Sequence, residues 1–247
     1  MKQALYKILS NKPEAPGVYR MVLSGDTSPI RAPGQFADIR LDGFYLRRPI
    51  SLFDWDMKTL TVIYRVVGQG TEAMSRMQPG QMLDLLLGLG NGFDTAPSGK
   101  KPLLIGGGVG APPLFGLCKK LLREGKKPQV ILGAGTREAL ICGEDFRALG
   151  VPVIFATADG SCGIHGLVTD AMKQTDYSYF YTCGPMPMFR AIHAIATTGG
   201  QFSFEERMGC GFGACMGCTC HTKSGAKRIC KDGPVLFRED IEWETQA

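Results

Sequence analysis

The sequence lacks a long uninterrupted apolar run. Its longest apolar stretches, Met82–Gly90 and Pro102–Leu117, are broken by glycine, proline or aspartate. Neither reaches the ~18 consecutive apolar residues that a membrane span requires. The segment Met1–Lys7 also lacks the apolar core of a secretory signal. We therefore expect a cytoplasmic protein that does not enter a membrane.

Neither the net charge nor the histidines indicate a functional site. The 28 Lys and Arg residues exceed the 23 Asp and Glu residues by a net charge of +5, which is too mild for a concentrated nucleic-acid-binding face. The three histidines, His165, His193 and His221, form no grouping with a nucleophile or with metal ligands. No general-base constellation is present either, so we assign no catalytic residues and expect a partner to handle any organic substrate.

The remaining composition is that of an ordinary globular protein, with 44% apolar and 21% charged residues over 247 positions. Residues 1–96 contain short alternating or β-branched runs, such as Gln35–Leu41 and Thr59–Val67, separated by Gly and Pro turns. This pattern predicts an antiparallel β-barrel, with a sandwich as the alternative.

The pattern changes near residue 97. Over 97–200, apolar strands at Pro102–Ile105, Val130–Leu132, Val151–Ala156 and Tyr177–Thr182 alternate with helical stretches, which predicts a parallel α/β sheet. Residues 201–247 hold too few apolar residues for a core of their own, so a metal centre would supply the missing stability. The predicted class is a multidomain β plus α/β protein with a small C-terminal module.

Cysteine is concentrated in that C-terminal module. Five of the nine cysteines lie within 21 residues, and Cys210, Cys215 and Cys218, followed by Cys230, have the C-x4-C-x2-C…C spacing of a [2Fe–2S] cluster. The small residues between them let backbone N–H groups approach the sulfur atoms. Zinc on Cys215, Cys218, Cys220 and either His221 or Cys230 is the alternative. Zinc sites favour two separated ligand pairs, so the spacing favours iron–sulfur.

Two segments of the predicted barrel are candidates for flavin binding. Arg48-Pro49-Ile50-Ser51 combines an Arg that can pair with a pyrophosphate and a Ser that can hydrogen-bond flavin or phosphate oxygens. Alone, this segment is more typical of an ordinary strand edge. It gains weight from the second segment, Ile63-Tyr64-Arg65, which leads into a turn at Gly70-Thr71 that opens a helix. Tyr64 is either a stacking partner for the isoalloxazine ring or a half-buried strand residue.

The predicted sheet carries the candidate nicotinamide-nucleotide site. Gly107, Gly108 and Gly110 follow an apolar strand and precede a helix, the context of a dinucleotide-binding turn. The last strand ends in Cys183-Gly184-Pro185, which places Cys183 to contact a nicotinamide, whereas a lone Cys at such a position is more often a core residue. Thr136-Arg137 follows the second strand, where Arg would favour NADP, whereas the adjacent Glu138 would favour NAD.

In their order along the chain, these motifs resemble the ferredoxin-reductase flavoprotein family. The segments Leu89–Phe93, Asp159–Ser161, Glu206–Cys218 and Cys230–Leu236 narrow the resemblance to the electron-transfer subunits of class 1B dihydroorotate dehydrogenases. The resemblance implies FAD on Arg48–Ser51, Ile63–Arg65 and Gly70-Thr71, and a [2Fe–2S] cluster that excludes Cys220. It also implies an FMN-containing catalytic partner subunit in a two-plus-two heterotetramer, with NAD⁺ as the electron acceptor.

Two alternatives remain open from the sequence. One is a subunit of an NADP-linked ferredoxin oxidoreductase or hydrogenase, which shares this domain order. The other is a non-catalytic zinc-bearing module that binds a nucleotide as a regulator. Because nicotinamide exchanges hydride, clusters exchange single electrons and flavin exchanges both, a chain with all three sites is a converter between the two kinds of transfer.

Overall fold

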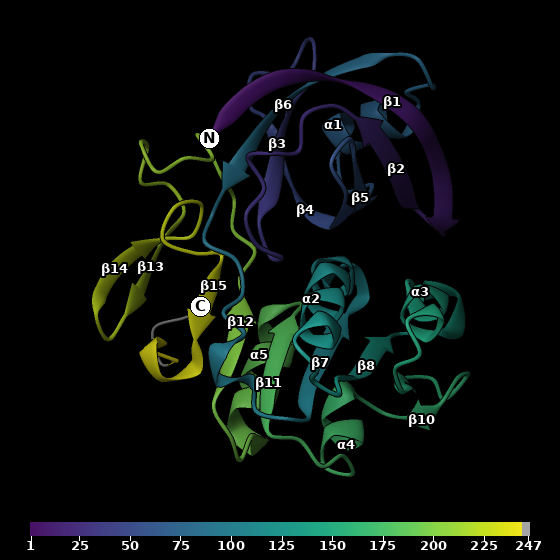
Figure 1. Cartoon of the computed structure of the whole chain (residues 1–247), viewed down its shortest axis with the longest axis vertical. Helices are drawn as coiled ribbons and strands as arrows, with labels where there is room; N and C mark the ends of the chain where they lie inside the picture. The colour runs from purple at the N-terminus through teal and green to yellow at the C-terminus, as the bar shows by residue number, and fades with distance from the viewer. Residues whose placement is uncertain (244–247) are drawn as a thin grey trace.

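A computed structural model describes residues 1–243, so residues 244–247 at the end of the predicted cysteine module lie outside the described part. Figure 1 shows a barrel at one end of the molecule, an α/β sheet at the other, and the C-terminal segment lying along one side of both.

The N-terminal part is a closed antiparallel barrel with the strand order β1-β2-β5-β4-β3-β6, and β6 pairs with β1 to complete it. This confirms the predicted barrel over the sandwich. Along β5, Leu60, Val62 and Tyr64 point into the barrel core, whereas Ile63 packs on the opposite side in the core shared with the α/β sheet. The elements are β1 (Lys2–Ala15), β2 (Val18–Ser24), β3 (Phe36–Arg40), β4 (Arg48–Trp55), β5 (Thr59–Arg65), α1 (Gln69–Ser75) and β6 (Met82–Leu89).

The second part is the predicted parallel sheet, in the order β10-β9-β8-β7-β11-β12-β15. Every neighbouring pair is parallel except β12 with β15. The chain runs outward from β7 to β10 and then returns to the other side at β11, so the order reverses between β7 and β11. The elements are η1 (Ala96–Ser98), β7 (Pro102–Gly107), η2 (Gly108–Gly110), α2 (Pro112–Arg123), β8 (Gln129–Ala134), η3 (Arg137–Ala139), α3 (Gly143–Ala148), β9 (Val153–Thr157), β10 (Ile164–His165), α4 (Val168–Met172), β11 (Tyr179–Cys183), α5 (Met186–Ile195) and β12 (Gly200–Ser203).

The C-terminal segment contributes to the sheet as well as carrying the cysteines. Its buried residues Cys218, Ile229, Cys230 and Leu236 belong to the same apolar core as Ile105 of β7. The few apolar residues of this segment therefore do not form a core of their own but share one with the sheet. The elements are β13 (Thr219–Thr222), β14 (Gly225–Arg228), β15 (Val235–Phe237) and η4 (Arg238–Asp240).

Aromatic and ionic contacts join the barrel to the sheet. Phe53 of β4 stacks on Phe115 of α2 with ring centroids 4.3 Å apart, and Lys119 Nζ lies 2.7 Å from Asp54 Oδ1. α2 therefore packs directly against β4, the strand that begins with the predicted flavin segment. No helix among residues 1–243 is both long and apolar enough to span a membrane.

Candidate functional site

The two predicted flavin segments lie in contact on the barrel. The Arg48 guanidinium, half-buried at the start of β4, packs so closely on Gly70 that a side chain there would overlap it. Arg48 also lies over the Phe44 ring, 4.8 Å from its centroid. The Thr71 hydroxyl accepts hydrogen bonds from the N–H groups of Val67 and Gly68 at 2.9 and 3.2 Å, which holds the turn before α1. A cationic position therefore lies beside a fixed glycine turn.

Tyr64 lies inside the barrel. Its ring stacks on Tyr19 at 5.9 Å, its hydroxyl donates to Asn11 Oδ1 at 3.0 Å, and only 2% of the residue is exposed. Of the two roles predicted for Tyr64, stacking on the isoalloxazine ring or packing as a strand residue, this burial supports packing. Because the Tyr64 side chain points into the barrel core, only its backbone could contact a ligand. The next residue, Arg65, reaches the cavity described below.

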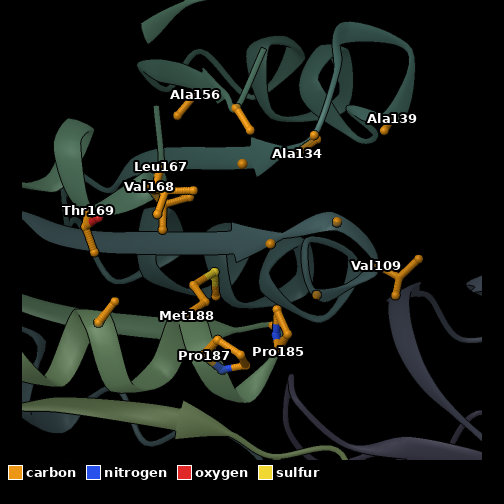
Figure 2. A pocket seen from close by; sticks show the side chains of 18 of the residues that line it. Val109, Ala134, Ala139, Ala156, Leu167, Val168, Thr169, Pro185, Pro187 and Met188 are labelled. Carbon is orange, nitrogen blue, oxygen red and sulfur yellow. The ribbon is translucent and has the colours of Figure 1, made fainter. Parts of the chain in front are cut away.

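A cavity of about 530 Å³ opens at the carboxyl ends of the parallel strands, next to the switch point between β7 and β11. Ligands of open α/β sheets bind at this position. Figure 2 shows its apolar walls, to which Val109, Ala134, Pro185 and Met188 contribute. The predicted residues Gly107, Gly108, Gly110, Gly184 and Pro185 all line it.

The close approach of backbones explains the glycines. A Cβ on Gly110 would overlap the carbonyl of Cys183, and Gly108 has a positive φ of 54°. Cys183 itself does not line the cavity. It is 1% exposed, burial raises the pKa of its thiol far above the ordinary value, and Ser203 hydrogen-bonds it. At this strand end, the residues that line the cavity are Gly184 and Pro185.

Glu205 is a cavity residue that the sequence analysis missed. It lines the cavity together with Arg65 of β5. Burial raises the pKa of the Glu205 carboxyl, and the nearby Arg65 guanidinium partly offsets that effect. The signal was available, because Glu205 follows β12 at the strand ends where ligand-binding groups gather.

Arg137 holds a loop beside the cavity, and Ala139, the last residue of the same short helix, lines the cavity wall. Its N–H donates to Ser161 Oγ at 2.8 Å and its Nε donates to the Ser161 carbonyl at 3.2 Å, while Ser161 Oγ donates to Asp159 at 2.6 Å. The pKa of Glu138 is lowered by its own N–H group and by the Thr136 hydroxyl. Two carboxylates, of Glu138 and Asp159, therefore lie near Arg137, whose Nε is engaged with the loop.

The four predicted cluster cysteines converge in two pairs. Cys210 Sγ accepts the N–H groups of Ala214 and Cys215 at 3.2 and 3.4 Å, and the Cys215 thiol hydrogen-bonds it as well. Cys230 N–H donates to Cys218 Sγ at 3.4 Å, and the two side chains are hydrogen-bonded. Backbone N–H groups around a sulfur favour thiolate, the form that binds iron.

The pKa of the Cys210 thiol shows this effect. Burial alone would raise it, but N–H groups from Cys215, Phe212 and Ala214 lower it to about 6. Gly211 and Gly213 in the loop have φ of 76° and 92°, conformations that suit glycine.

Cys220 lies on β13 and is buried. The pKa of its thiol is raised, first by burial and then by the charges of Glu206 and Cys218. Among the described residues, the metal-type ligand atoms that gather within 4.8 Å of one another belong to Glu14, Cys142 and Asp145, and not to the C-terminal cysteines. A tetrahedral zinc site would bring its sulfurs closer than that, so the arrangement in pairs fits a two-iron cluster better.

The cysteine loop rests on the barrel at Asp38. This residue of β3 is 2% exposed, and it lies so close to Gly211 that any side chain at that glycine would overlap its Oδ2. Burial raises the pKa of Asp38 to about 6, opposed by Arg47 and Arg48 and reinforced by Cys210. Asp38 pairs with Pro49 in the β3–β4 register. One residue therefore separates the cysteine loop from the predicted flavin segment.

Comparison with known proteins gives consistent matches. Residues 205–242 match the family described as the iron–sulfur cluster binding domain of dihydroorotate dehydrogenase B. The chain is 40% identical, over 98% of its length and 99% of the relative's, to a protein of Geobacillus sp. (strain WCH70) named dihydroorotate dehydrogenase B (NAD⁺), electron transfer subunit. A protein of Fusobacterium nucleatum with the same name is 38% identical over 93% of this chain and 95% of its own.

Solved structures show the same architecture. A structure of the NADH-dependent reduced ferredoxin–NADP oxidoreductase aligns with a TM-score of 0.89 and 28% identity, covering 98% of this chain and 91% of that one. The ferredoxin–NADP⁺ reductase of Neisseria gonorrhoeae aligns with a TM-score of 0.68 over 79% of this chain and 92% of its own, at 20% identity, which shows the shared fold alone.

Proposed function

The chain belongs to the family of electron-transfer subunits of NAD⁺-linked dihydroorotate dehydrogenase B, and we propose that it carries electrons between a catalytic partner subunit and NAD⁺. The observation that carries this proposal is the contact of Asp38 with Gly211. It places the cysteine loop one residue away from the strand that holds Arg48–Ser51. A cluster site and a flavin site would thus be neighbours across a single side chain.

The residues present fit three cofactors. Arg48–Ser51, Ile63–Arg65 and Gly70-Thr71 would hold FAD, with Arg48 opposite its pyrophosphate. Cys210, Cys215, Cys218 and Cys230 would hold the [2Fe–2S] cluster in their two pairs. Bound FAD would supply the exchange between hydride transfer and single-electron transfer that the other two groups require.

The cavity would take the nicotinamide nucleotide. Gly107, Gly108 and Gly110 would allow its phosphates to approach the backbone, and Gly184 and Pro185 line the same cavity. Arg65 of β5 and Glu205 also line it. They give the cavity one positive and one negative group that would orient the nicotinamide end.

We propose NAD rather than NADP as the preferred nucleotide. Glu138 and Asp159 would repel a 2′-phosphate, and Arg137 is engaged with Ser161. Comparing NADH with NADPH as reductant tests this, because Arg137→Ala should leave a preference for NADH intact. A loss of NADPH reduction in that variant, from a parent that uses NADPH well, would instead assign Arg137 to the 2′-phosphate. That result would favour the ferredoxin–NADP oxidoreductase function that the structural likeness keeps open.

The partner we propose is an FMN-containing dihydroorotate dehydrogenase catalytic subunit in a two-plus-two heterotetramer. Cys215 is exposed, and Phe212 and Met216 beside it are 45% and 52% exposed. An apolar edge next to a cluster ligand suits a docking partner that exchanges electrons there. A cytoplasmic location is supported by the need to keep the cluster thiols reduced.

An anaerobic assay of the natively co-purified complex tests the proposal. Dihydroorotate-dependent reduction of NAD⁺, with an FMN-bearing second chain present, is the expected result. A coloured protein that NADH or NADPH reduces, but that shows no activity with dihydroorotate, would shift the assignment to the ferredoxin oxidoreductase or hydrogenase group. A colourless preparation would favour a zinc-bearing regulatory module.

A further inference from the structure

A short Gly-Asn-Gly segment, residues 90–92, holds the end of the barrel against residues 232–235, which follow Cys230, the last predicted cluster ligand. It leaves the barrel directly after β6 and belongs to none of the cofactor-binding segments assigned above. Gly90 has a φ of 72°, and a Cβ there would lie 2.6 Å from Pro234 Cδ and 2.9 Å from the Gly233 carbonyl. The two stretches of backbone are therefore as close as glycine allows.

The Asn91 side chain hydrogen-bonds to the backbone of residues 232–235 and uses its full hydrogen-bonding capacity. Its Nδ2 donates to the carbonyls of Val235 at 2.7 Å and Asp232 at 3.3 Å. Its Oδ1 accepts the N–H groups of Val235 at 3.1 Å and Gly92 at 2.8 Å. A carboxamide offers two donors and two acceptor sites, and all four are used. The Asn91 N–H adds a fifth bond, to the Gly233 carbonyl at 2.7 Å.

This contact replaces a missing strand neighbour. β15 pairs through one edge with β12, and Val235 is opposite Ser203 in that register. The N–H and carbonyl of Val235 point the other way, toward Asn91, which binds both as an adjacent strand residue would. Asn91 thus links three parts of the molecule: the end of the barrel, the edge of the sheet, and the segment that begins at Cys230.

We propose that Asn91 is a positioning residue that sets where the cysteine module sits on the barrel, and thereby the rate of electron passage between the flavin and cluster sites. This inference rests on the proposed function. Asparagine is specific here because aspartate would direct an oxygen at the carbonyls of Val235 and Asp232, whereas alanine would leave both edges of the contact open.

The test compares Asn91→Ala and Asn91→Asp with the parent, using the full chain. A matched control is Ser178→Ala, because Ser178 also bridges two stretches of backbone, but at the amino end of β11, away from the cofactor-binding segments. Its Oγ donates to the Ser98 carbonyl at 2.6 Å and accepts the Lys101 N–H at 3.0 Å. The first readout is amide hydrogen exchange of residues 230–237 in the metal-free protein. The second is the rate of cluster reduction after a light pulse reduces the flavin with electrons from an added sacrificial donor such as EDTA, which starts the internal step without NADH.

We expect Asn91→Ala to accelerate exchange at 230–237 at least about tenfold, since several hydrogen bonds are lost. We expect the internal step to slow by about tenfold or more, because small displacements of reacting groups have large rate effects. Asn91→Asp should show both effects, and Ser178→Ala should show neither.

Unchanged exchange at 230–237 in Asn91→Ala would overturn the proposal. So would faster exchange with an internal step as fast as in the parent, because Asn91 would then stabilise the chain without positioning the module. If the variant does not retain its cluster, exchange in the metal-free protein and the internal step in Asn91→Asp decide the question. Absence of any internal step in the parent would contradict the proposed function instead, and the exchange result would still judge the contact.

Discussion

Removing Arg20 tests how firmly the barrel is held to the α/β sheet. Arg20 on β2 donates to both oxygens of Asp145 on α3 at 2.9 and 2.7 Å, and to both oxygens of Glu14 at 2.8 and 2.7 Å. Its guanidinium also lies 4.7 Å from the centroid of the Phe53 ring. Glu14, Asp145 and Cys142 have ligand atoms within 4.8 Å of one another, so the guanidinium occupies the place where a cation is needed.

The magnitude follows from burial and from the charges left behind. The Arg20, Glu14 and Asp145 side chains are 26%, 19% and 25% exposed. Removing one partner from a buried ion pair costs about 3–5 kcal/mol, and this partial exposure places Arg20→Ala at the lower end, about 3 kcal/mol. For a chain of this size, that corresponds to a fall of about 6–12 °C in the midpoint of thermal unfolding.

Thermal unfolding of Arg20→Ala beside Lys101→Ala is the assay. Lys101 pairs with Asp176 at 2.9 Å, but the two side chains are 56% and 84% exposed, so its removal should change stability by less than about 1 kcal/mol. Arg20→Lys should lie between the two, because lysine keeps the charge but lacks the planar fork that binds two carboxylates. Equal midpoints for Arg20→Ala and Lys101→Ala would refute the reasoning.

Three further outcomes are expected. Cys215→Ser should abolish the visible and electron paramagnetic resonance signals of the cluster, whereas Cys220→Ser should keep them; a normal cluster in the first variant would contradict the ligand set. Arg48→Ala should weaken FAD retention about tenfold or more on dialysis, because a charged phosphate contact is lost, and full retention would show that Arg48 does not bind FAD. The pKa of Asp38 is raised from 3.8 to about 6. Between pH 3.8 and about 6, the folded metal-free protein therefore binds more protons than the unfolded chain does. As a result, the folded protein loses stability as the pH rises through this range. Asp38→Asn should therefore stabilise the metal-free protein by about 2–3 kcal/mol at pH 7 and by little below pH 4 in urea unfolding, whereas an equal gain at both pH values would exclude ionisation of Asp38 as the cause.

Local patterns in the sequence were sufficient for the chemistry of each segment. The spacing of Cys210, Cys215 and Cys218 lies within one loop, and the glycines of residues 106–110 lie within one turn, so ligand type and turn geometry follow from neighbours along the chain. The alternating runs of residues 1–96 predicted the barrel, and the strands that alternate with helical stretches in residues 97–200 predicted the parallel sheet. Both patterns are also local along the chain. The sequence did not predict which way the Cys183 side chain points, because a residue at a strand end can face either side of the sheet. In the structure it is buried beside Ser203.

What the sequence by itself determined is which cofactor chemistry each segment can support. The tertiary structure alone decided how those segments meet: Asp38 against Gly211, Arg48 against Gly70, and Asn91 against Val235, a pair 144 residues apart. Such contacts depend on strand order and on the packing of a shared core, and no periodicity along the chain encodes them. The contacts of Asp38 and Asn91 further depend on the pairing of β15 with β12, which lays the C-terminal segment alongside the barrel.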